Sequence, residues 1–232
     1  MKIRYCLLGS VPALAGILLM IFVAVDSFIL QGAFLDGTNQ KYGVAGDLHM
    51  SQEDLTKATY AMVEYVEGKI PKAQVMVVVD GQKTGFFTEK ELVHLEDVRN
   101  LIHGFKVFRN ICIIIFAVGA ILFLYKKKIR ELCVGFWISW GILLLAAFAV
   151  GAFAFIDIDL VINGFHEIFF DNDLWILSFS KHRSLWMFQD EMYVDFLRYI
   201  AGIMTAILGI TMVGTVIAYR TSQHIYERND KE

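Results

Sequence analysis

The sequence has few charged residues, few prolines and no excess of basic residues. Charged residues make up 19% of the 232 positions, below the roughly 25% of soluble domains, and the formal net charge is −3. A nucleic-acid-binding protein would carry a basic surplus, so this class is excluded. With 2 prolines, 18 glycines and no heptad repeat, the sequence also excludes collagen, disordered chains and coiled coils.

Cysteine and serine motifs are absent from the polar parts of the chain. The three cysteines, Cys6, Cys112 and Cys133, all lie in or beside apolar segments. The polar connections therefore offer neither a disulfide framework nor a CxxC metal site. A covalent thiol intermediate in these connections is excluded for the same reason, and no G-x-S-x-G motif marks a nucleophilic serine.

Apolar residues, at 56% of the chain, are concentrated in long segments. A transmembrane helix needs about 20 mostly apolar residues. We expect four such helices, at residues 1–30, 107–125, 132–156 and 199–219. The first is too long for a typical signal peptide and lacks a clear cleavage site, so we expect it to be retained. The remaining segments are two large connections at 31–106 and 157–198, a short turn at 126–131 and a tail at 220–232.

Basic residues beside the spans predict the orientation of the chain. They occur at the start of the chain, in the 126–131 turn and in the tail (Lys2, Arg4, Lys126, Lys127, Lys128, Arg130, Arg220, Arg228 and Lys231). An even number of spans places these three segments on one side of the membrane, and the positive-inside rule makes that side the cytoplasm. We therefore expect a multi-pass protein of the plasma membrane with both termini inside and both large connections outside.

The first connection contains signals for a small folded domain. Ser51–Asp54 has the spacing of a capping box, and apolar residues then recur at helical spacing, which predicts a helix over 51–67. The β-branched run 73–79, the Asp80-Gly81 turn and Gly85–Phe87 predict a β-hairpin. A second capping box at Thr88–Glu91 begins a helix predicted to continue to about Tyr125, a length of about 55 Å. The expected fold is mainly α, with four transmembrane helices and a small α+β extracytoplasmic domain built from the two connections.

Two of the six histidines lie in these connections with carboxylates nearby. His94 has Glu91 and Asp97 at i−3 and i+3, on the same helix face. His166 precedes Glu167, but the second histidine of an HExxH zinc motif is missing. Histidine acid–base chemistry, which suits neutral pH, is therefore favoured over a metal site, and a structural role for either histidine stays open.

The second connection is also rich in aromatic residues. Phe165, Phe169, Phe170 and Trp175 lie close to His166 in the sequence. Such a run is typical of a membrane interface or a lipid-facing cleft, and equally of the core of a small domain. In the first connection, Tyr42 is the notable aromatic residue of a polar, glycine-rich stretch.

The whole chain resembles the four-span family of lipoprotein intramolecular transacylases of low-GC Gram-positive bacteria. The resemblance rests on Ser51–Leu55 followed by Tyr65, on His94–Val98, and on Asp159 with His166–Phe170 and then Trp175. The order of spans and connections also matches. The family usually has an acid before a Leu-Ile pair and a proline shortly after it, and Arg183–Gln189 of this chain has neither.

This resemblance implies an acyltransferase that moves the sn-2 acyl chain of a diacylglyceryl-cysteine lipoprotein onto the lipoprotein's own N-terminal α-amine, giving the lyso-form. It implies that His94 and His166 are catalytic and that no cofactor or metal is needed. The supporting residues would be Glu91, Asp97, Asp159 and Glu167, and the substrate-binding residues Tyr42, Phe165, Phe169, Phe170 and Trp175. The expected partners are the diacylated lipoprotein and membrane lipid. A membrane-anchored binding protein without catalysis and a metal-dependent membrane hydrolase remain the alternatives.

Overall fold

The computed structural model describes residues 3–29 and 32–229, and the chain divides into two compact units. The helical unit comprises Met1–Ala24, Val107–Ile162 and Ala201–Glu232, and the α+β unit comprises Val25–Lys106 and Asn163–Ile200. Lys2, Lys231 and the predicted boundary between residues 30 and 31 lie outside the described residues. Both large connections contribute to the α+β unit.

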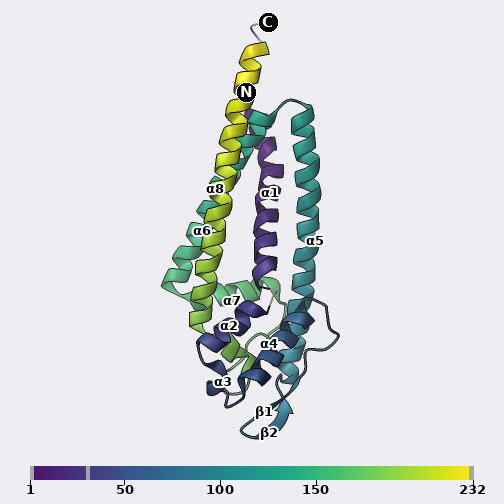
Figure 1. The fold of residues 1–232 in the computed structure, drawn as a ribbon, viewed down its shortest axis with the longest axis vertical. Helices are drawn as coiled ribbons and strands as arrows, with labels where there is room; N and C mark the ends of the chain where they lie inside the picture. The colour runs from purple at the N-terminus through teal and green to yellow at the C-terminus, as the bar shows by residue number, and fades with distance from the viewer. Residues whose placement is uncertain (1–2, 30–31, 230–232) are drawn as a thin grey trace. The chain divides into compact units, whose positions relative to one another are not determined.

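Among the described residues, four helices are long and apolar enough to cross a membrane: α1 (Ile3–Ile29), α5 (Glu89–Tyr125), α6 (Ile129–Ile156) and α8 (Asp190–Asn229) (Figure 1). The mainly helical, four-span fold class is thus confirmed. Helix α5 has the predicted bounds and 37 residues. Helix α8 is 40 residues long and extends past the predicted span on both sides, because neither Arg198 nor Arg220 interrupts helical structure.

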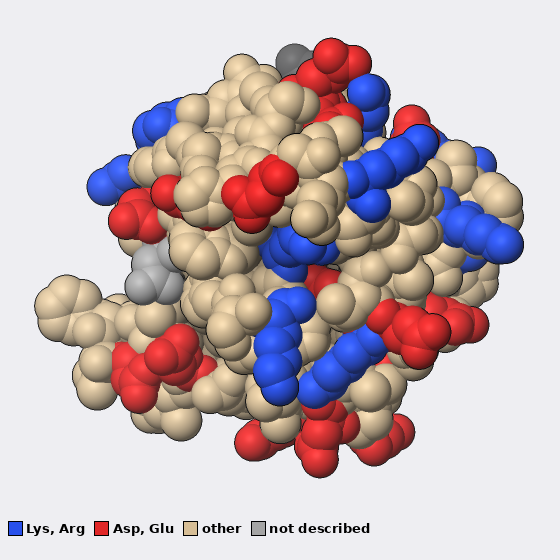
Figure 2. Space-filling model, turned by 90° about the horizontal axis from the view of Figure 1, so that it is seen from below, with Lys and Arg blue, Asp and Glu red and all other residues tan. Residues whose placement is uncertain are grey.

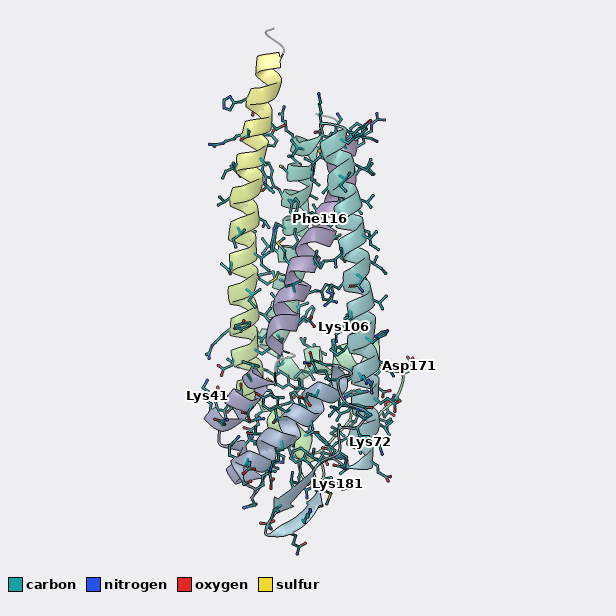
Figure 3. The ribbon with its side chains drawn as sticks, turned by 45° about the vertical axis from the view of Figure 1, so that its right-hand side comes forward. Lys41, Lys72, Lys106, Phe116, Asp171 and Lys181 are labelled. Carbon is teal, nitrogen blue, oxygen red and sulfur yellow. The ribbon has the colours of Figure 1, made fainter. Side chains whose placement is uncertain are left out.

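In the helical unit, α1 and α6 approach each other through residues with small side chains. A β-carbon on Gly135 would lie 2.3 Å from the backbone carbon of Gly9, so only glycine permits this contact. The Ser139 hydroxyl donates a hydrogen bond of 3.0 Å to the Ser10 carbonyl at the same crossing. Further along α1, the Phe116 ring of α5 fills the space beside Gly16 (Figure 3). Close packing at small residues is the usual way in which helices associate in lipid.

Indole groups join α6 to α8. Trp140 Nε1 donates to Thr211 Oγ1 at 2.8 Å, and one turn earlier Trp137 Nε1 donates to Thr215 Oγ1 at 2.9 Å. An indole N–H has no water partner in a hydrocarbon environment, so each of the two indoles needs an acceptor from the protein, and each finds one threonine hydroxyl.

The α+β unit begins with α2 (Ala33–Lys41), α3 (Val44–Asp47) and α4 (Gln52–Val66), followed by the hairpin of β1 (Met76–Val79) and β2 (Gln82–Gly85). The Ser51 side chain caps α4 by accepting a 3.1 Å hydrogen bond from the Asp54 amide, as its spacing predicted. Positive φ angles of 50° at Asp80 and 77° at Gly81 give the predicted two-residue turn. The core includes Leu55, Val77, Phe86 and Met187, and Met187 comes from a 3-10 helix at Arg183–Met187 in the second connection.

The second connection also contains a helix that the sequence analysis missed. Helix α7 spans Ile158–Phe169 and carries His166 in its last turn. The Asp157 carboxylate caps it by accepting hydrogen bonds from the amides of Asp159, at 3.0 Å, and Leu160, at 3.3 Å. An aspartate directly before an apolar run is a helix-start signal, so the sequence did contain an indication of α7.

The crossing of α1 and α6 predicts a strong effect of one methyl group. Gly135→Ala places a β-carbon inside van der Waals distance of the α1 backbone, and we expect it to lower the free energy of unfolding by about 1–3 kcal/mol. The measurement is thermal unfolding of the purified protein in detergent. Gly141→Ala is the matched control, because a β-carbon there meets no atom within 4 Å. Equal effects of the two substitutions would contradict this account of the crossing.

Candidate functional site

The first turn of α5 positions His94. The Thr88 amide donates to Glu91 Oε2 at 2.6 Å, and the Glu91 amide donates to Thr88 Oγ1 at 3.3 Å, which completes the predicted capping box. His94 follows one turn later, in the α+β unit, about 20 Å of helix before the predicted span at 107–125. The helix start therefore fixes the face on which the imidazole lies.

The Glu91 carboxylate also connects α5 to the second connection. Its Oε1 atom accepts hydrogen bonds from the Ser184 amide at 2.9 Å and from the Ser184 hydroxyl at 2.6 Å. Glu91 is only 1% exposed. Both of its oxygens thus bond to groups other than His94, and Glu91 ties the 3-10 helix to the start of α5.

His94 and His166 lie next to each other although 72 positions separate them in the sequence. Their ring centroids are 5.9 Å apart, with an angle of 36° between the ring planes. The Phe170 ring contacts both, with centroids 5.2 Å from His94 and 5.5 Å from His166. Trp175 stacks on His166 at 4.8 Å and 23°. The structure therefore brings together four of the residues that the sequence analysis selected.

Further phenylalanines continue the aromatic cluster from His166 along α7 to α5. Phe165 lies 5.6 Å from His166 and 4.7 Å from Phe169, and Phe169 lies 5.8 Å from Phe105. Phe165 and Phe169 remain 42% and 43% exposed, whereas Phe170 is buried. The imidazole pair thus has one buried aromatic neighbour and a partly exposed apolar surface beside it.

The surroundings of His94 favour its neutral form. The ring is half-buried, and its Nδ1 atom is buried with no hydrogen-bond partner among the residues that the structure describes. Burial lowers the pKa of His94 below its usual 6.5, and the nearby His166 and Lys90 add to this effect, while the Asp97 carboxylate opposes it. A neutral imidazole with an unpaired nitrogen is able to accept a proton from a bound substrate.

Asp97 holds the turn that follows α7. Its Oδ2 atom accepts a 3.0 Å hydrogen bond from Asn172 Nδ2, and Asn172 Oδ1 accepts one of 2.9 Å from the Leu174 amide. The segment between His166 and Trp175 is therefore anchored on α5 one turn after His94. Asp97 thus acts on His94 through its charge and on the neighbouring segment through a hydrogen bond.

Three other predicted site residues lie elsewhere. Asp159 is exposed in the first turn of α7, two turns before His166. Glu167 is exposed and follows His166 directly, so it lies on a different helix face. Tyr42 donates a 2.8 Å hydrogen bond to Asp195, which also pairs with Lys41 at 2.5 Å.

The sequence analysis missed Ser184, Asn172 and the role of Arg183. The Arg183 guanidinium donates to the carbonyls of Gly85, at 3.1 Å, and Phe86, at 3.5 Å, and so attaches the 3-10 helix to the hairpin. The stretch in which this chain departs from the family pattern is therefore used for packing within the α+β unit. No local sequence signal identifies these three residues, because each acts on a distant segment.

A metal site and a polyanion surface find no support in the residues described. Within 3–29 and 32–229, no three His, Cys, Asp or Glu side chains are grouped so that they could hold a metal ion. Figure 2 shows one face of the molecule, on which Lys and Arg side chains are interspersed with Asp and Glu. The imidazole pair is accordingly interpreted through its acid–base chemistry.

Comparisons with known proteins agree on one family and fold. The family model described as "Lipoprotein intramolecular transacylase Lit" matches residues 11–193. The solved structure of membrane-integral Lit from Bacillus cereus has a TM-score of 0.66 at 16% identity, covering 100% of both chains. Two variants of that protein, with a histidine replaced by arginine or by alanine, give TM-scores of 0.65 at 15% and 14% identity. They cover 98% and 99% of this chain and 93% and 96% of their own. No curated protein matches the chain. The fold is thus that of a multi-pass membrane protein.

The hydrogen bonds of Glu91 predict a large loss of stability when the carboxylate is removed. Glu91→Ala leaves the Ser184 amide and hydroxyl without their buried acceptor, and we expect a loss of about 3 kcal/mol. Thermal unfolding of the purified protein is the measurement. The control, Glu89→Ala, removes an exposed acid from the same helical turn and should change stability by about 0.5 kcal/mol at most. A Glu91 variant as stable as this control would contradict the assignment.

Proposed function

Because the chain belongs to the lipoprotein intramolecular transacylase family, we propose that it moves the sn-2 acyl chain of a diacylglyceryl-cysteine lipoprotein onto that lipoprotein's own N-terminal α-amine. The product is the lyso-form, with an N-acyl chain and an S-monoacylglyceryl group. The observation that carries this proposal is the pair of His94 and His166, with ring centroids 5.9 Å apart beside a partly exposed aromatic surface.

The first step is attack of the α-amine nitrogen on the sn-2 ester carbonyl. The amine must be neutral to attack, and its pKa is about 7.7–8.0. As the N–C bond forms, the nitrogen releases a proton, which His94 accepts. The lowered pKa of His94 and its unpaired Nδ1 atom support this assignment as the base. General base catalysis of this kind contributes roughly 10²–10⁴-fold.

The second step is collapse of the tetrahedral intermediate. The bond between the carbonyl carbon and the sn-2 oxygen breaks, and its electron pair stays on that oxygen, which takes a proton from His166. Transfer of one proton from His94 back to His166 then restores both rings. Stacking on Trp175 holds the His166 ring in one orientation, as this role requires.

Amine and ester belong to the same substrate molecule, so the main task of the enzyme is to hold them in attack geometry. The exposed faces of Phe165 and Phe169 provide an apolar surface for the acyl chains. We assign both termini to the cytoplasm and the site to the outer face of the plasma membrane, on the basis of the basic residues in the 126–131 turn and at the two ends.

The imidazole pair predicts that each histidine is required and that the two act as one unit. We expect His94→Ala and His166→Ala each to lower the transfer rate by about 10²–10⁴-fold. The double variant should be little slower than either single variant, because groups that act together are not additive. The measurement is mass spectrometry of the lipoprotein N-terminus in a host that makes diacyl lipoproteins.

The control for both variants is His103→Ala, which removes an exposed histidine from the same helix α5. It should leave the yield of lyso-form unchanged. A properly inserted His94→Ala or His166→Ala protein with full activity would refute the assigned roles. A wild-type protein that leaves the diacyl lipoprotein unchanged would refute the proposed reaction and favour a binding function.

The opposing effect of Asp97 predicts a shift in the pH profile. Asp97→Asn removes the charge that raises the pKa of His94 but keeps an oxygen to accept the Asn172 hydrogen bond. The pKa of His94 therefore falls further, and the base stays neutral to lower pH. We expect the break in the profile of log(kcat/KM) that reports protonation of His94 to lie at lower pH in the variant than in the wild type.

Glu96→Gln is the control for this shift, because it removes the same charge from the next, exposed position. Its pH profile should coincide with that of the wild type. A shift of the His94 break to higher pH in Asp97→Asn, or no shift at all, would exclude His94 as the base.

A further inference from the structure

The helical unit contains an apolar groove, and neither histidine of the imidazole pair lines it. It has a volume of about 510 Å³ and is lined by residues of α1, of α5 and of the turn that joins α5 to α6. Apolar side chains that include Val11, Ile114 and Val118 line its length. Tyr5, Lys126 and Lys128 line the end beside the turn. The groove is therefore hydrocarbon-like along its length and cationic at one end.

The shape of the groove follows from one close contact between the helices. A β-carbon on Gly119 would lie 2.3 Å from the β-carbon of Pro12, so α5 approaches α1 closely only because position 119 has no side chain. Larger side chains on both sides, among them Leu122 and Phe123, form the walls. The helices thus leave a channel along their contact line that no side chain of the helical unit fills in the described structure.

The two lysines at the end of the groove differ in how they are held. The Lys128 ammonium lies 4.6 Å from the centroid of the Tyr5 ring and 3.4 Å from Glu131 Oε1, which fixes its position. Lys126 is exposed, and its ammonium has no ion pair or hydrogen bond with the residues that the structure describes. A fixed cation and a free one at the same end of the groove match the charge of a phosphate group.

We propose that this groove is a binding site for one anionic phospholipid. An acyl chain lies between α1 and α5, and the headgroup phosphate lies on Lys126 and Lys128. Since the groove opens on helices that cross the membrane, the ligand comes from the bilayer itself. Each lysine near a membrane surface contributes about a fivefold preference for anionic lipid. A zwitterionic lipid also carries a cationic amine, which the same lysines repel.

The experiment is native mass spectrometry of the full-length protein in detergent, titrated with phosphatidylglycerol or with phosphatidylcholine of the same acyl chains. We expect phosphatidylglycerol to bind at least tenfold more tightly. Lys126→Gln should weaken its binding about fivefold. Lys127→Gln is the matched control: it removes the same charge from the same turn at a position that does not line the groove, and it should change binding less than twofold.

A second pair of variants tests the apolar part of the site. Ile114→Trp fills the groove and should weaken both lipids at least fivefold, whereas Ile113→Trp, next to it but outside the groove, should not. Val118→Phe repeats this test with a smaller change.

Equal affinities for the two lipids would overturn the proposal. Equal effects of Lys126→Gln and Lys127→Gln would also overturn it, because the lysines would then serve only to orient the chain in the membrane. A dimer that dissociates on Ile114→Trp would make a second copy of this chain the occupant and would also overturn it.

Discussion

The buried carboxylate of Glu91 is the interaction on which the imidazole site depends. Such a group is costly to bury unless donors surround it, and here the donors come from Thr88 and Ser184 on two different connections. The same carboxylate therefore caps the start of α5 and binds the segment that follows α7. His94 lies one turn after Glu91, so the restraint that stabilises the α+β unit also sets the position of the candidate base.

The helical unit is held together by different forces. In lipid there is no hydrophobic gain from pressing two apolar helices together, so close packing and buried hydrogen bonds must hold them. The Gly9–Gly135 contact provides close packing, and the Trp140–Thr211 pair provides a hydrogen bond. Both depend on single residues within long apolar runs, where hydropathy identifies a span but not its neighbours.

Features of this structure are predictable from the sequence when the interacting residues are close together in the chain, and not when they are far apart. The caps at Ser51 and Thr88, the Asp80-Gly81 turn and the length of α5 are local, and all were predicted. Helix α7 is not evident from its aromatic residues, because such a run is equally typical of a membrane interface and of the core of a small domain. The bond from Glu91 to Ser184 joins residues 93 positions apart, and no local pattern reports such a contact. The two histidines were predicted through a family resemblance, but the distance between their rings required the fold.

The apolar surroundings of the pair bear on the choice between transfer and hydrolysis. An ester held near a general base is open to attack by water as well as by an amine, and water is far more abundant. Phe170 contacts both imidazoles and Trp175 stacks on His166, so fewer water molecules reach the candidate base, His94. The same burial lowers the pKa of His94 and keeps it ready to accept a proton. Removal of the imidazole from water thus has two effects that acyl transfer to an amine needs. It favours the neutral form of His94, and it favours the amine over water as the nucleophile.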